Sequence, residues 1–265
     1  MLTNYHTHTP FCDGKSTVEE VVLSALEKGF DAIGFSGHGY TAFDHTYCMK
    51  DTEGYLAEVR RVKEKYRKDI EIYAGIEEDA ADLVERGKFD YILGSSHYFC
   101  VNRVYYPIDS SYECLQKCVS AYGGDALKMA EDYFSFFCTY INRYKPDIIG
   151  HFDLLTKFEE QHPFFLENAD YRALAVRYAL EAAKSGSVFE VNTGAISRGY
   201  RTTPYPHTDI LHALKKVGAR VMLCSDSHHA STLDFGFDEA RALLKEVGFS
   251  SLVTLRHGVF TDEDI

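Results

Sequence analysis

Seven short apolar runs recur along the chain, and segments with helical spacing separate them. The runs lie at residues 2–9, 31–37, 71–78, 89–96, 147–152, 187–193 and 220–226. Most are apolar at consecutive positions, as in "DAIGFSG" and "DIIGHF", and do not alternate with polar residues. Strands buried on both faces have this pattern, and such strands are typical of parallel sheets. We therefore expect seven parallel strands.

The helical segments carry start and stop signals. Thr17 and Glu20 have the spacing of a capping box, and Gly29 follows the end of that helix. Apolar residues fall on one helical stripe in the segment 125–144, and Gly248 ends a later helix. Repeated strand–helix units with right-handed crossovers predict an α/β fold with a parallel sheet. We expect residues 1–265 to form one closed or nearly closed barrel, with a doubly wound open sheet as the alternative.

One segment interrupts this alternation. Residues 98–125 show no clear strand or helix pattern, and we expect a loop-rich excursion over one end of the barrel. Tyr105, Tyr106 and Tyr112 lie in it and could form part of a lid over a site. Ordinary aromatic packing would explain the three tyrosines equally well.

Composition and charge narrow the classes of partner. The chain has 45% hydrophobic and 26% charged residues, with a formal net charge of −12. An acidic chain has no electrostatic footprint for general binding to nucleic acid or membranes, so we expect neither partner. We find no signal peptide and no apolar run long enough to span a membrane. The seven scattered cysteines fit reduced thiols and a cytoplasmic location.

Metal-ligating residue types gather where the expected strands end. His6 and His8 are two residues apart, so a strand would turn both side chains to one face. A single histidine after a strand is usually a cap or a loop residue, but here nearly every strand end supplies a donor. Active sites of α/β barrels are built at this edge. The candidate ligands are His6, His8, Asp13, His38, Glu77, His97, His151, Asp226 and His228.

These donors indicate a particular class of site. Imidazole and carboxylate groups suit divalent ions such as zinc, manganese or iron, and no cysteines cluster with them. Nine donors exceed the needs of one ion, so we expect two or three. Such ions would form a positive pocket in an acidic protein. That pocket suits a phosphate monoester, which a metal-bridging hydroxide would attack.

The motif set resembles that of the polymerase and histidinol phosphatase (PHP) superfamily. The shared features are the His-x-His pair, His38, Glu77, "SSH", "GHFD" and "SDSH", in this order over nearly the whole chain. The resemblance implies a distorted (β/α)7 barrel with a trinuclear metal centre at the C-terminal ends of the strands. It assigns one ion to His6, His8, Glu77 and Asp226. A second ion falls to Glu77, His97 and His151, and a third to Asp13, His38 and His228.

Two further features resemble the stand-alone histidinol-phosphatase branch. One is an aspartate at position 13, where many members have histidine, and the other is the segment "EVNTGAISRGYRTTPYP". The resemblance implies that Arg198 contacts the substrate phosphate, for which a guanidinium is well shaped. Arg201 is a weaker candidate for the same role. We expect Lys157 to be a surface residue.

Asp153 lies two residues after His151 and is a candidate for catalysis or substrate binding. It could orient a metal ligand, donate a proton to the leaving group, or pair with a substrate ammonium. The expected function is hydrolysis of L-histidinol phosphate to L-histidinol and phosphate in histidine biosynthesis. The alternatives are another small phosphate ester or nucleotide as substrate, and a metal-binding module without activity.

Overall fold

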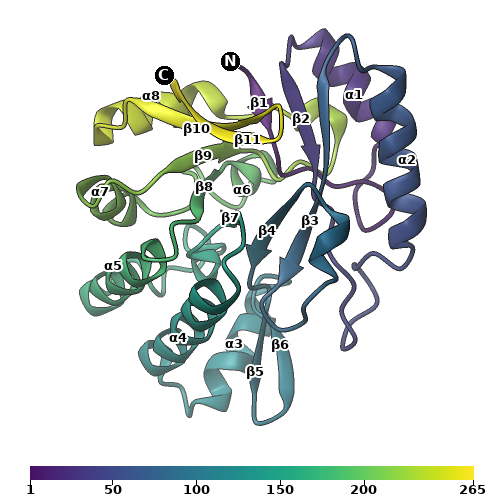
Figure 1. The fold of residues 1–265 in the computed structure, drawn as a ribbon. Coiled ribbons are helices and arrows are strands. Elements are labelled where there is room, and N and C mark those ends of the chain that lie inside the picture. The colour runs from purple at the N-terminus through teal and green to yellow at the C-terminus, as the bar shows by residue number, and fades with distance from the viewer.

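A computed structural model describes residues 1–265, and a seven-stranded parallel sheet forms its centre (Figure 1). The strand order is β1-β2-β3-β4-β7-β8-β9. Their bounds are Thr3–Asn4, Ala32–Phe35, Glu71–Asp79, Tyr91–Ser95, Ile148–Ile149, Val188–Asn192 and Val221–Cys224. All seven expected strands are confirmed. Six of them are shorter than the apolar runs, and candidate ligands follow the ends of five of these six, β1, β2, β4, β7 and β9.

The two outer strands approach each other, so the sheet is a nearly closed barrel. Thr7 and Ser227 form an isolated parallel bridge just beyond β1 and β9. The amide of His8 donates to Ser227 O at 2.8 Å, and the amide of Ser227 donates to His6 O at 3.1 Å. The distorted (β/α)7 barrel is therefore confirmed, and the open doubly wound sheet is wrong. This closure also brings His6, His8 and the residues after β9 to one place.

Helices cover the outside of the sheet, as Figure 1 shows. The capping box at Thr17 is formed, since Glu20 N donates to the Thr17 hydroxyl and the Glu20 carboxylate accepts from Thr17 N. The expected helix at 125–144 spans Ala126–Tyr144, with Asp125 as its N-cap. The helices are α1 Val18–Glu27, α2 Thr52–Lys65, α3 Tyr112–Ala121, α4 Ala126–Tyr144, α5 Ala169–Ala183, α6 Gly194–Ser197, α7 Thr208–Lys216 and α8 Phe237–Val247.

The segment 98–125 is not loop-rich, which corrects the expectation. It contains the antiparallel hairpin of β5 (Tyr98–Val101) and β6 (Val104–Pro107), followed by α3. Asn102 and Arg103 make the two-residue turn, and both have positive φ. Such turns usually carry glycine at the second position. Because this turn has arginine there, the sequence carries no signal for it.

A second hairpin, β10 (Ser251–Arg256) with β11 (Val259–Asp264), covers the N-terminal end of the barrel. The Tyr5 hydroxyl donates to Leu255 O at 2.7 Å and accepts from Leu255 N at 3.0 Å. Arg256 binds Glu71, the first residue of β3, at 2.7 Å. Because this end is closed and packed, the opposite end is left for chemistry. No helix of the protein has both the length and the apolar character needed to span a membrane.

Candidate metal centre

The candidate ligands converge at the C-terminal edge of the barrel. Glu77 lies inside β3, and the other donors follow the ends of β1, β2, β4, β7 and β9. Seven of the nine are buried: His6, His8, His38, Glu77, His97, His151 and Asp226. The remaining two, Asp13 and His228, are partly exposed at the rim. The cluster therefore contains residues from both ends of the chain. Its first and last members, His6 and His228, are 222 positions apart.

Glu77 lies at the centre of this cluster. Its Oε2 is 3.2 Å from His6 Nε2 and 2.9 Å from His38 Nδ1. Its Oε1 is 3.1 Å from His151 Nε2 and 3.3 Å from His97 Nε2. With His8 Nε2 at 3.5 Å from Oε2, one carboxylate thus faces five imidazoles with its two oxygens. A carboxylate in this arrangement can bridge two cations.

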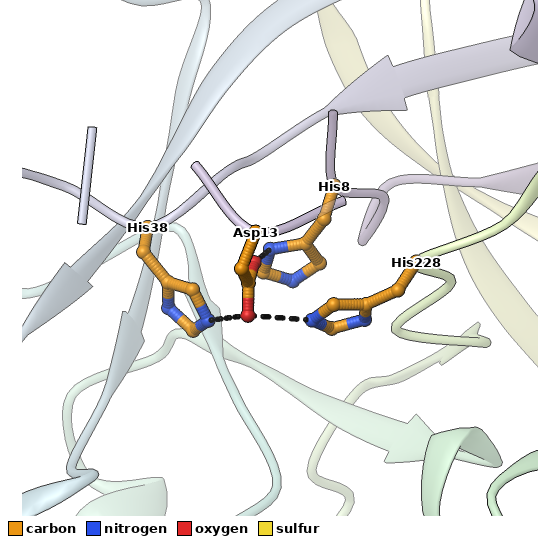
Figure 2. A group of neighbouring side chains, drawn as sticks. All are labelled: His8, Asp13, His38 and His228. Carbon is orange, nitrogen blue, oxygen red and sulfur yellow. Dashed lines mark ion pairs between the residues drawn. The ribbon is translucent and has the colours of Figure 1, made fainter. Parts of the chain in front are cut away.

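Asp226 and Asp13 extend the cluster on either side of His8. Asp226 Oδ1 is 3.1 Å from His8 Nε2 and 3.5 Å from His6 Nε2. Figure 2 shows Asp13 between His38 and His228, with His8 behind it. Asp13 Oδ2 is 3.3 Å from His228 Nε2 and 3.7 Å from His38 Nε2. These contacts bring together all nine predicted donors, but their groups only overlap with the three implied sets, since His8 also lies beside Asp13 and His38 beside Glu77.

The donor set fits divalent ions. Four overlapping groups have their ligand atoms within 4.8 Å of one another, for example His6 with His8 and Asp226. Several of these atoms are buried without a hydrogen-bond partner, among them His6 Nε2, His8 Nε2 and Glu77 Oε2. Leaving buried polar atoms unpaired is costly, so a native protein normally supplies a partner for them. A cation is the partner that imidazole nitrogen and carboxylate oxygen share.

The electrostatics also favour positive charge in the cluster. Burial alone would lower the pKa of His6, but the carboxylates of Glu190, Glu77 and Asp226 raise it to about 10. Burial would raise the pKa of Glu77, yet the histidines around it hold that pKa well below its ordinary value. The carboxylates thus attract cations strongly, and divalent ions can replace the protons on the histidines.

Two buried carboxylates that were not among the predicted site residues form hydrogen bonds with the histidine ligands. Glu190 Oε1 is 2.6 Å from His6 Nδ1, and its Oε2 accepts the His151 amide at 2.7 Å. Asp79 Oδ2 is 3.4 Å from His97 Nδ1 and accepts the His97 amide at 2.9 Å. A charged residue inside the apolar run "SVFEVNT" was the available signal for Glu190. Such carboxylates fix the ring orientation of a ligating histidine.

Arg198 follows α6 and reaches the edge of the cluster. Its Nη2 is 2.8 Å from Asp226 Oδ2, and its Nη1 donates to Asp226 O at 2.9 Å. The same Nη1 is 3.3 Å from His228 Nδ1. The side chain remains 31% exposed.

Asp153 and Arg201 are not among the clustered donors and do not line the cavity beside them. The Asp153 carboxylate is fully buried and accepts the His207 amide at 2.9 Å. The Arg201 guanidinium donates to the Thr156 hydroxyl and stacks 4.4 Å from the centre of the Tyr205 ring, and Arg201 is only 4% exposed.

Lys157 is not a surface residue, which corrects the expectation. Its side chain is 13% exposed, and its Nζ lies 3.1 Å from Asp109 Oδ2. It also donates to the backbone oxygen of Asp109 at 2.7 Å. The burial of Lys157 could not be predicted from the sequence, because its partner Asp109 lies 48 positions away in the chain.

A cavity of about 250 Å³ opens beside the cluster and shares Asp13, His38 and His97 with it. None of the three tyrosines proposed for a lid lines this cavity. Tyr105 stacks on Phe43 at 4.1 Å, and Tyr112 stacks on His162 at 4.0 Å. For these two residues the packing alternative fits the structure. The aromatic wall of the cavity consists of Tyr47 and Tyr98.

Comparisons with known proteins agree with this architecture. The chain is 29% identical to the "Probable histidinol-phosphatase" of Schizosaccharomyces pombe, covering 97% of this chain and 90% of that protein. It is 25% identical to the histidinol-phosphatase of Bacillus subtilis, covering 88% and 96%. A solved histidinol phosphate phosphatase from Lactococcus lactis, complexed with zinc, L-histidinol and phosphate, superposes with a TM-score of 0.73. That match has 21% identity and covers 98% of each chain.

The sequence also matches the model of one protein family. The PHP domain matches residues 4–194, a range that includes seven of the nine clustered donors. The two donors beyond the matched range, Asp226 and His228, lie in the same cluster. On this match the chain belongs to the PHP domain family.

Proposed function

We propose that this protein is a metal-dependent phosphatase that hydrolyses L-histidinol phosphate to L-histidinol and phosphate, a step of histidine biosynthesis. The observation that carries the proposal is the convergence of nine donor residues, with Glu77 at their centre, beside a polar cavity. The two histidinol-phosphatases that match the chain do so over most of their length, which favours the same substrate. We also propose that residues 1–265 act as one domain.

The ligand assignment is part of this proposal. His6, His8, Glu77 and Asp226 would hold one ion, Glu77, His97 and His151 a second, and Asp13, His38 and His228 a third. Bound divalent ions supply Lewis acidity to phosphoryl oxygens and lower the pKa of water. Glu190 and Asp79 would keep the imidazoles of His6 and His97 turned toward the ions.

Other residues of the chain would bind and orient the substrate. Arg198 would direct its remaining N–H donors at the phosphate, while its bonds to Asp226 hold the guanidinium in place. Asp153 would have an orienting role, because its buried carboxylate holds the His207 amide and does not line the cavity. Seven cysteines without a disulfide favour a reducing compartment, and we propose the cytoplasm.

Phosphate release from the metal-loaded protein tests the proposal. We expect kcat/KM for L-histidinol phosphate to exceed that for p-nitrophenyl phosphate and for nucleoside monophosphates by at least about tenfold, or roughly 1.4 kcal/mol. Glu77→Gln should abolish release from every substrate. A ratio near one would favour a general phosphoesterase, and an inert metal-loaded protein would favour a binding module.

A further inference from the structure

The cavity beside the metal centre has one wall that the proposed chemistry does not use. Asp44, Thr46 and Tyr47 from the segment after β2 form this wall, together with Tyr98 at the start of β5. Tyr47 lies edge-on to the ligand His38, with ring centres 4.8 Å apart. Tyr98 directly follows the ligand His97 and stacks on Tyr47 with ring centres 5.7 Å apart. The wall therefore begins at the ligands and leads away from them.

Asp44 is held on this wall by Tyr98 and Thr46. The Tyr98 hydroxyl donates to Asp44 Oδ2, while the amide and hydroxyl of Thr46 donate to Oδ1 at 2.8 Å and 2.7 Å. All three donors are neutral, so they fix the carboxylate without neutralising it. Although partial burial opposes ionisation, these hydrogen bonds lower the pKa of Asp44. The carboxylate is therefore ionised, oriented and without a cationic partner in the cavity.

The other charges on the cavity differ from Asp44. Asp109 and Lys157 both line the cavity, but they form an ion pair with each other at 3.1 Å. Burial would raise the pKa of Asp109, but Lys157, together with His97 and His151, lowers it to about 2, so Asp109 is ionised beside a lysine that balances its charge. Asp13 belongs to the metal cluster. Among the carboxylates that line the cavity, Asp44 is thus the one that neither belongs to the metal cluster nor pairs with Lys157.

We propose that Asp44 binds the primary ammonium group of the substrate and so selects phosphate esters of amino alcohols. This inference rests on the proposed function and identifies the group that would bind the cationic end of the substrate. The phosphate end would meet the positive metal centre, and the ammonium would make a charge-assisted hydrogen bond to the fixed carboxylate. A metal-loaded centre and the Asp44 carboxylate would thus present opposite charges to the same cavity, which would match a zwitterionic ester and disfavour a plain phosphate ester.

The test compares L-histidinol phosphate with its deamino analogue, 3-(imidazol-4-yl)propyl phosphate, and with p-nitrophenyl phosphate. We expect Asp44→Asn to lower kcat/KM for L-histidinol phosphate about 10- to 100-fold, and to leave the two substrates without ammonium within about twofold of wild type. Tyr98→Phe, which removes one of the hydroxyls that aim Asp44, should lower the same preference by a smaller factor. Because asparagine keeps the shape and an acceptor oxygen, the loop should stay in place.

Asp82→Asn is the matched control, because Asp82 anchors the same loop through the Ala42 amide at 2.7 Å but does not line the cavity. It should change none of the three rates. An equal loss on all substrates in Asp44→Asn would indicate a structural role and overturn the inference, as would an unchanged preference for L-histidinol phosphate. If the wild-type protein hydrolyses p-nitrophenyl phosphate but not L-histidinol phosphate, the proposed function itself fails.

Discussion

At the scale of single residues, buried carboxylates decide how the imidazoles point. Glu190 contacts two of the candidate ligand residues at once, through the His6 ring and the His151 amide, and Asn192 Nδ2 donates to it at 3.0 Å. With Nδ1 of His6 engaged, Nε2 is left to face the cluster. The carboxylate also raises the basicity of the ring as a metal ligand.

We expect Glu190→Gln to weaken metal binding about 10- to 100-fold, because an amide cannot supply the negative charge that polarises His6. Competition for zinc with a chromophoric chelator measures this directly. Glu78→Gln is the control, since Glu78 is an equally buried carboxylate next to Glu77 that pairs outward with Arg86. Equal affinities in the wild type and both variants would contradict the positioning role.

At the scale of elements, the sequence predicted the features that local patterns determine. Continuous apolar runs identified all seven strands, and because parallel strands end at one edge, the donors after them had to converge. The hairpin at 98–107 escaped prediction because Asn102 and Arg103 adopt positive φ without a glycine. The contact of Lys157 with Asp109 and that of Asp44 with Tyr98 were also out of reach. Each joins segments that only the folded barrel places together.

The strands β2 and β3 contain glycines whose role appears only in the packed structure. The ring of Tyr91 lies across them, and a Cβ on Gly75 would come within 2.3–2.5 Å of ring atoms. The Tyr91 hydroxyl donates to Tyr5 O at 2.6 Å, so the ring cannot move freely. We expect Gly75→Ala to lower the free energy of unfolding by about 1–3 kcal/mol, measured by urea denaturation.

Gly87→Ala provides the comparison for Gly75→Ala. Gly87 lies in the short turn Arg86–Lys88, where a Cβ would meet nothing within 4 Å. We expect a change below about 0.5 kcal/mol there, as for other surface substitutions. A Gly75→Ala protein with the unfolding midpoint of Gly87→Ala would show that Tyr91 can move aside and that the packing argument is wrong.

At the scale of the whole molecule, the metal centre joins segments that lie far apart in the chain. His6 and His8 belong to the first strand region, Glu77 to the third strand, and Asp226 follows the last strand of the barrel. Ions bound among them would contact both sides of the seam that Thr7 and Ser227 close. Since an unfolded chain cannot hold these donors together, bound metal stabilises the folded state alone.

Removing the metal should therefore lower the thermal stability of the whole barrel. Metal at about 100 times its dissociation constant stabilises a fold by about 2.7 kcal/mol per site. For a chain of this size, that corresponds to a fall in Tm of at least about 5 °C on treatment with a chelator. Scanning fluorimetry before chelation, after it, and after zinc is restored measures the change.

Glu77→Gln removes the shared carboxylate, so that variant should show a much smaller shift in Tm, both on chelation and on return of zinc. If the wild type and Glu77→Gln melt alike under all three conditions, the clustered donors do not hold metal across the seam, and the site has to be explained by hydrogen bonding among its own histidines and carboxylates.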